Sequence, residues 1–63
     1  MNKKQIITRG NSAVVIIEQD NFVLANLYVN ARNGLENADI SNISWTGKTL
    51  DGAIRWAEKQ LSK

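Results

Sequence analysis

The chain contains no cysteine, no histidine and no proline. Without cysteine and histidine it can form no disulfide, no thiolate or imidazole metal site, and none of the commonest nucleophile–base pairs of enzymes. The lack of cysteine also fits a reducing compartment, so we expect a cytoplasmic location. We therefore predict no cofactor, no bound metal and no catalytic residue; a metal site of carboxylate oxygens alone stays possible, but no acidic residues occur at the spacing of a calcium loop.

Long hydrophobic runs are also missing. The longest one, residues 13–17, is far too short to span a bilayer. The pair Lys3-Lys4 is followed by Ile6 and Ile7, but no apolar stretch of signal-peptide length comes after it. We therefore expect no membrane partner.

With 63 residues, the chain lies near the lower limit for independent folding. A domain of this size buries only about 60% of the surface of its unfolded chain. Small scaffolds compensate with disulfides, a metal or self-association. Because the first is excluded and nothing indicates the second, the sequence favours a homodimer or a complex with another protein.

Three dipeptides with turn propensity divide the first three quarters of the chain into strand-like segments. They are Gly10-Asn11, Asp20-Asn21 and Asn33-Gly34, and Gly, Asn and Asp are the residues favoured in two-residue hairpin loops. We therefore predict a single domain, 1–63, of the α+β class: a four-stranded antiparallel β-meander followed by one C-terminal helix (ββββα). The strands are expected near 4–9, 12–19, 22–32 and 35–45, and the helix near 50–62.

The predicted loops also determine which side chains share a face of the sheet. The first two hairpins place Val14 opposite Ile7 and Leu27. The third is expected to pair Leu27 with Ile40, Leu24 with Ile43, and Phe22 with Trp45. Since opposed residues share a face, the apolar residues of one face are Ile7, Val14, Ile16, Val23, Ala25, Leu27, Val29, Ala38 and Ile40. Those of the other are Ile6, Ala13, Val15, Ile17, Phe22, Leu24, Tyr28, Ile43 and Trp45.

The helix is predicted from apolar residues at helical spacing, namely Leu50, Ala53, Ile54, Ala57 and Leu61. Thr49 is a favourable N-cap, and Asp51 complements the helix dipole in the first turn. We expect the helix to cover the face that carries Trp45, because a short link joins Trp45 to the helix.

The other, aliphatic face would then be left uncovered, and an uncovered apolar face indicates an interface. The residues expected to mediate self-association are Val14, Ile16, Ala25, Leu27 and Ile40. The alternative is that flanking side chains of the monomer cover this face.

Cations on the helix define a second candidate surface. Arg55, Lys59 and Lys63 recur at a spacing of four, and Trp56 flanks them. We expect these four residues to contact a partner protein; the alternative is a solvated face whose Trp seals the core. Nucleic-acid binding is a further alternative and would use Lys3, Lys4, Arg9, Arg32, Arg55 and Lys59. No Lys or Arg occurs between Gly10 and Ala31, which disfavours a sheet that reads nucleic acid.

Two patterns in the chain are similar to features of enzymes. Gly47-Lys48-Thr49 before a helix is similar to the end of a phosphate-binding loop, but that motif requires glycine where Asn42 stands. The acidic residues fall mostly at turns, strand ends and the outer surface of the helix, which is typical of solvated charges. We therefore predict that the protein is not an enzyme.

The segment from Thr49 to Leu61 resembles a helix found in small bacteriophage proteins, including inhibitors of bacterial RNA polymerase and the arm-binding domains of phage integrases. The ββββα pattern is similar to phage or prophage accessory proteins of the host-enzyme inhibitor or anti-CRISPR type. This resemblance implies a protein that acts in the bacterial cytoplasm by blocking a surface of a host protein.

Overall fold

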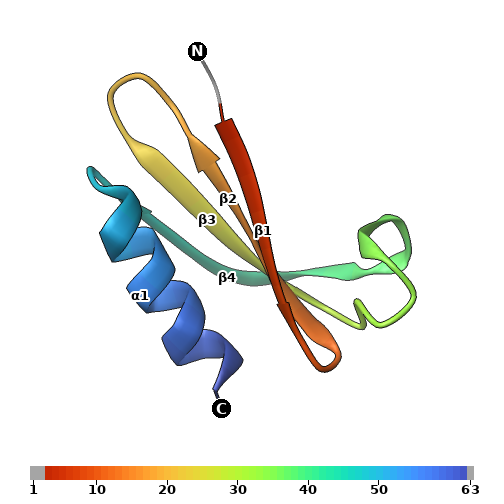
Figure 1. Cartoon of the computed structure of the whole chain (residues 1–63). Helices are drawn as coiled ribbons and strands as arrows, with labels where there is room; N and C mark the ends of the chain where they lie inside the picture. The colour runs from red at the N-terminus through yellow and green to blue at the C-terminus, as the bar shows by residue number, and fades with distance from the viewer. Residues whose placement is uncertain (1–2, 63) are drawn as a thin grey trace.

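The computed structural model describes residues 3–62 and shows one antiparallel sheet with a helix on one side (Figure 1). The elements, in chain order, are β1 (Lys3–Arg9), β2 (Ser12–Glu18), β3 (Val23–Val29), the 3₁₀ turn η1 (Leu35–Asn37), β4 (Asp39–Gly47) and α1 (Leu50–Leu61). The strands are hydrogen-bonded in the order β1-β2-β3-β4. The predicted ββββα fold is therefore confirmed.

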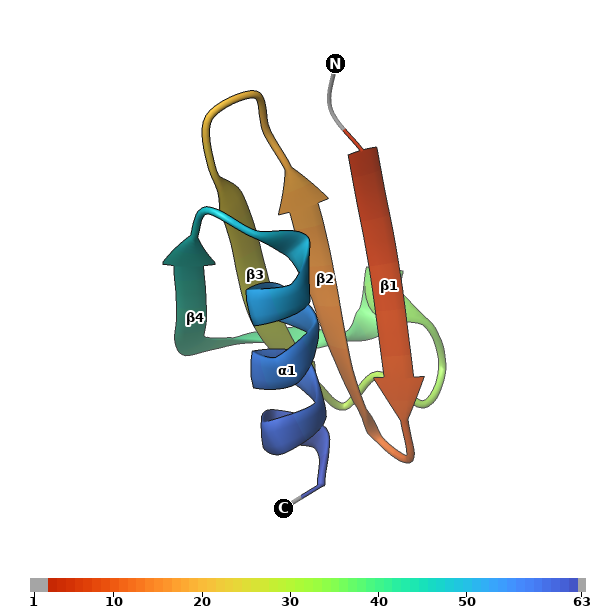
Figure 2. The same cartoon turned by 60° about the vertical axis from the view of Figure 1, so that its left-hand side comes forward.

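The helix begins where the cap was predicted. The Thr49 side chain accepts a hydrogen bond of 3.1 Å from the backbone N–H of Gly52, which satisfies a donor of the first turn. Ala53, Ala57 and Leu61 are buried against the sheet. Figure 2 shows α1 in front of the middle of the sheet, with β1 standing to one side.

The first two hairpins have the predicted loops and register. Gly10 has a φ of 61°, and Arg9 pairs with Ser12 across the first loop. Around Asp20 and Asn21, the N–H of Gln19 donates to the carbonyl of Phe22 at 2.9 Å. Consequently Val14 lies opposite both Ile7 and Leu27, as predicted.

The third connection is not the predicted two-residue hairpin. Strand β3 ends at Val29, and β4 begins only at Asp39. Asn30 leaves the strand in the left-handed region with a φ of 57°, and Gly34 has a φ of 105° just before η1. The dipeptide Asn33-Gly34 therefore lies inside a longer loop and does not join two strands directly.

Hydrogen bonds from the first turn hold this longer loop in place. The Asn11 carbonyl accepts from the N–H of Ala31, and the Asn11 Oδ1 accepts from the N–H of Arg32 at 3.0 Å. Asn30 donates to the Asp39 carboxylate at 2.7 Å. These contacts between distant parts of the chain outweigh the local preference of Asn-Gly for a tight turn.

The longer loop changes the register between β3 and β4. Trp45 pairs with Ala25 instead of Phe22, and Ile40 pairs with Tyr28 instead of Leu27. Both shifts span an odd number of residues, so both side chains move to the opposite face from the one predicted. A β-bulge separates the two paired stretches.

As a result, α1 covers the aliphatic face, and the prediction that it covers the other face is wrong. Trp45 does pack beneath the helix, but the changed register places it beside Ala25. The core beneath α1 consists of Val14, Ile16, Val23, Ala25, Leu27, Ala53, Ala57 and Leu61. Ile7, Trp45, Leu50, Ile54 and Trp56 pack around it.

Two glycines make room for the Trp45 indole. A Cβ on Gly47 would overlap the ring, and a Cβ on Gly52 would lie 3.0 Å from it. Gly52 is unfavourable inside a helix by about 1 kcal/mol relative to alanine. The close approach of Trp45 explains why glycine is suited to this position.

Candidate protein-interaction surfaces

The residues predicted to mediate self-association lie mostly in the core. Val14, Ile16 and Ala25 are at most 1% exposed and Leu27 is 8% exposed, all beneath α1. These four side chains cannot contact a second copy while the helix is in place. Ile40 is 62% exposed and lies on the other side of the sheet. An exposed sheet surface therefore exists, but on the face opposite to the one predicted.

We call this opposite side the open face. The register assigns to it Lys4, Ile6, Thr8, Ala13, Val15, Ile17, Leu24, Asn26, Tyr28, Ile40, Ser44 and Thr46. Lys4 is the one charged residue in this set. Depletion of charge is typical of the central part of a protein interface.

The open face is not uniformly exposed. Ala13 is fully buried and Val15 is 5% exposed, although no helix lies over them. Val15 stands between Ile6 on β1 and Asn26 on β3, so side chains of the same face enclose it. On the two outer strands, Ile6 is 45% and Ile40 is 62% exposed, and Phe22, just before β3, is 43% exposed. Neighbouring side chains therefore cover the centre of the open face and leave its edges exposed. The aliphatic face, for which such covering was the alternative, is covered by α1 instead.

The predicted partner-binding residues lie on the outer part of α1. Arg55 and Lys59 are exposed, whereas Trp56 is half-buried and packs against the core. Lys63 lies outside the described residues. Because Gly52 faces Trp45 of β4 and Trp56 follows it by about one turn, helical geometry places Trp56 toward β4.

The cations predicted for nucleic-acid binding lie on three parts of the chain: β1, the loop before β4, where the N–H of Arg32 donates to Asn11, and α1, which carries Arg55 and Lys59. Lys3, Lys4 and Arg9 belong to β1, at one edge of the sheet. Lys59 lies on the flank of α1 that faces β4, the other edge. A nucleic-acid strand needs a continuous row of cations along its phosphates, and this distribution does not provide one across the open face.

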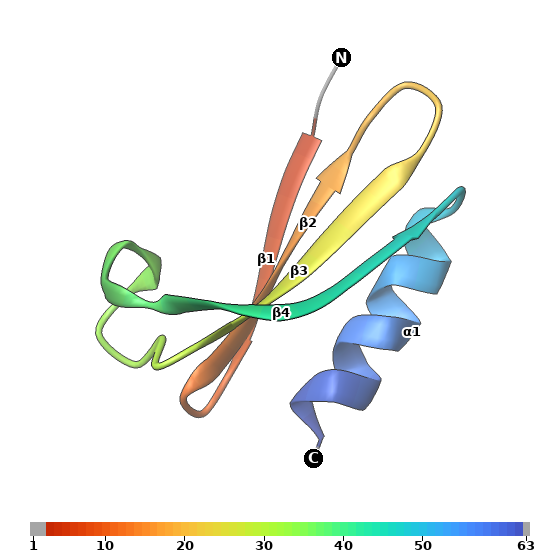
Figure 3. The ribbon, with the colours of Figure 1, turned by 180° about the vertical axis from the view of Figure 1, so that it is seen from behind.

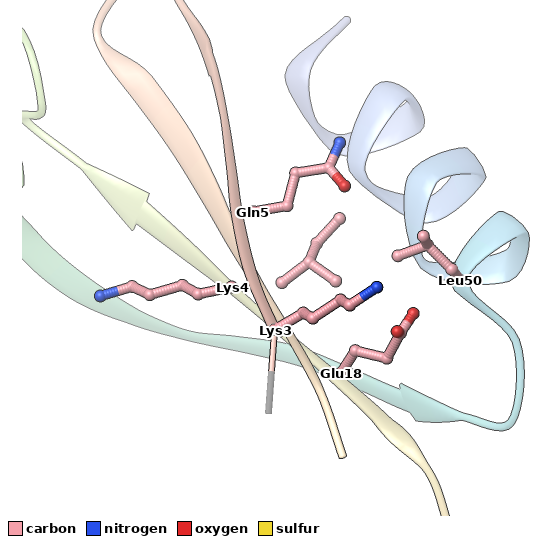
Figure 4. A pocket seen from close by; sticks show the side chains of 6 residues that line it. Lys3, Lys4, Gln5, Glu18 and Leu50 are labelled. Atoms are coloured by element: carbon pink, nitrogen blue, oxygen red, sulfur yellow. The ribbon is translucent and has the colours of Figure 1, made fainter. Parts of the chain in front are cut away.

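A pocket of about 410 Å³ lies between β1 and the start of α1 (Figure 4). Its lining residues are Lys3, Lys4, Gln5, Ile16, Glu18 and Leu50. Lys3 and Gln5 extend toward the helix, and Lys4 extends to the other side of the strand. No motif in the sequence indicates this pocket, because it arises from the position of α1 over the middle of the sheet.

The segment Gly47-Lys48-Thr49 has a structural explanation in two of its residues. Gly47 accommodates the Trp45 ring, and Thr49 caps α1. Within residues 3–62, no cluster of three or more His, Cys, Asp or Glu side chains is arranged to hold a metal ion. In the same range, no helix has the length and apolar character needed to cross a membrane.

No family model matches the chain, and no curated protein or solved structure matches it either.

Proposed function

We propose that this protein is a non-enzymatic protein-binding module that forms a homodimer through its open face. The observation that carries this proposal is the exposure of Ile6 and Ile40 on a face with a single charged residue. Burial of an aliphatic side chain contributes about 1.5–3 kcal/mol when it is complete. In a two-fold dimer each such contact occurs twice, which suits a chain with little core of its own.

The outer surface of α1 is the proposed contact with a second, different protein. Trp and Arg are enriched among residues that dominate binding energy, and Trp56 stands beside Arg55 and Lys59. The cations favour an acidic surface on the partner. Binding would act by covering that surface, which agrees with the resemblance to phage inhibitors of host enzymes.

The dimer is tested by analytical ultracentrifugation of the wild type and of Ile40→Ser. We expect a dimer at micromolar concentration and a weakening of self-association by Ile40→Ser of about tenfold or more, equivalent to about 1.4 kcal/mol. The matched control is Ile43→Ser. Ile43 is 45% exposed on the same strand and lies in the bulge, outside the paired residues that define the open face. A wild type that stays monomeric would disprove the dimer.

The partner contact is tested by affinity capture from a bacterial lysate with the wild type and Trp56→Ala. A protein retained by the wild type should be lost with Trp56→Ala and retained by Ile43→Ser. Equal capture by all three variants would show that Trp56 plays no part in binding.

A further inference from the structure

The two edges of the sheet differ in regularity. Strand β1 pairs with β2 without interruption from Lys3 to Arg9. Strand β4 is broken by the bulge, where the Ser41 hydroxyl donates to the Leu27 carbonyl at 2.8 Å and accepts from the N–H of Ile43 at 3.1 Å. Bulges bend an edge strand and hinder the pairing of a further strand with it. Strand β4 is visibly curved in Figure 3. A further strand therefore finds a regular edge only at β1.

The first hairpin determines which backbone groups β1 presents to solvent. In a hairpin with a two-residue loop, the closing pair Arg9–Ser12 is hydrogen-bonded, and bonded pairs then alternate along the ladder. The amide and carbonyl groups of Lys4, Ile6 and Thr8 consequently point away from β2. A strand that pairs with these groups would extend the sheet from four strands to five.

The charges on β1 indicate what such a strand should carry. Its charged residues are cations at the two ends, Lys3 and Lys4 at one and Arg9 at the other. A second copy of β1, antiparallel and centred on Ile6, would place Lys3 opposite Arg9 twice. Like charges directly opposite each other destabilise a pair of strands, and opposite charges stabilise it. The edge therefore disfavours another copy of itself and favours a segment with acidic ends.

The surroundings of β1 can accept side chains on both sides of an added strand. On the helix side, the pocket of Figure 4 extends from Lys3 and Gln5 to Leu50. On the open face, Ile6 is 45% exposed. Because side chains alternate along a strand, successive residues of the added segment would lie next to the pocket and next to Ile6.

We propose that the free edge of β1 binds an extended segment of a partner protein by strand addition, and that this segment has acidic residues at both ends and uncharged β-branched residues between them. Strand addition obtains affinity from main-chain hydrogen bonds and specificity from alternate side chains. The inference rests on the proposed protein-binding function; it uses the backbone edge of β1, which adjoins the dimer face at Ile6 and lies across the sheet from Ile40 and β4.

The probe is a synthetic peptide with glutamates at both ends and alternating valine and threonine between them. The control peptide carries lysines in place of the glutamates. We expect the acidic peptide to bind about tenfold more tightly or better, with a difference that shrinks as salt is added. Amide exchange followed by NMR should slow at Lys4, Ile6 and Thr8, and stay unchanged along β4. Equal binding of the two peptides, protection of β4 instead of β1, or no binding would overturn the proposal.

A pair of variants at Thr8 tests the backbone contact. Thr8→Pro removes an N–H that points to solvent, and proline is tolerated on an edge strand, so the fold should persist and peptide binding should weaken about tenfold or more. Thr8→Val keeps the N–H and should bind as the wild type does. If Thr8→Pro unfolds, the backbone contact is tested by changing the peptide instead. Alternate amides of an extended peptide point to opposite edges. N-methylation of the amides on one edge should abolish binding, and N-methylation of those on the other edge should not.

The dimer and the peptide site can fail independently. Ile40→Ser should weaken the dimer and leave peptide binding within about twofold of the wild type. Loss of peptide binding in Ile40→Ser would show that the peptide contacts the open face and not the edge of β1, and would overturn the inference.

Discussion

The two faces of this sheet bury their central residues by different means. Beneath α1, Val14 and Ile16 are closed off by a separate layer whose small residues, Ala53 and Ala57, allow close approach. On the open face, Val15 is almost as well buried by its neighbours on the adjoining strands. A four-stranded sheet can therefore enclose its own centre, while large apolar side chains stay exposed on the outer strands, at Ile6 and Ile40, and beside the second loop, at Phe22.

The largest expected effect is a loss of stability on truncating a residue beneath the helix, compared with the smaller loss at the rim of the open face. Ile16→Ala should lower the free energy of unfolding by about 2–5 kcal/mol, the range for a large-to-small change in a core. Ile6→Ala should cost clearly less, because Ile6 is already 45% exposed. Urea denaturation of both variants, at a concentration where the protein is monomeric, measures the difference. Equal losses would contradict the contrast between the two faces.

The next largest loss of stability is expected at the two glycines that pack against the Trp45 ring. Gly47→Ala should destabilise the protein by about 1–3 kcal/mol, as overpacking does, because the added methyl overlaps the indole. Gly52→Ala should cost less, since the gain in helix propensity of about 1 kcal/mol offsets part of the strain. Thermal unfolding followed by circular dichroism compares the two.

A double variant supplies the control for that comparison. With Trp45→Leu in the background, the cost of Gly47→Ala should largely disappear, because residues in contact are energetically coupled. An unchanged cost would mean that Gly47 is required by its backbone conformation and not by the ring.

A smaller effect is expected at the start of the helix. Thr49→Ala removes the acceptor for the N–H of Gly52 and should cost about 1 kcal/mol, whereas Thr49→Ser should retain most of the stability. Urea denaturation of the two variants measures the difference, and an equal loss in Thr49→Ser would show that the hydroxyl does not cap the helix.

The smallest effect is expected from the separated cations. In a gel-shift titration with duplex DNA at moderate salt, we expect no retardation, and Arg55→Ala and Arg9→Ala should behave as the wild type. Retardation by the wild type that is lost in both variants would show that cations of β1 and α1 bind the DNA together. It would support nucleic-acid binding as a function.

The sequence predicted the elements of this fold better than their pairing. The turns at Gly10-Asn11 and Asp20-Asn21 are formed by local backbone preferences, so their register could be read directly. The loop before β4 depends on bonds from Asn11 to Ala31 and Arg32, which are twenty or more residues away in the chain. Such contacts leave no periodic signal in the sequence.

That one loop accounts for the main errors in the predicted surfaces. Because of its length, Trp45 and Ile40 each lie on the face opposite to the predicted one. The helix, which is linked to Trp45, packs on the same face as Trp45. The set proposed for self-association therefore became core, except for Ile40. The positions of Arg55, Trp56 and Lys59 did not depend on the loop, because helical spacing alone fixes them.

The distribution of the chromophores has a practical consequence. The two tryptophans of the chain, Trp45 and Trp56, both pack on the α1 side, whereas its single tyrosine, Tyr28, lies on the open face. Indole emission should therefore report undocking of the helix, and phenol absorbance should report events on the opposite side. The native protein thus carries two spectroscopically distinct probes, one for each face, without any label.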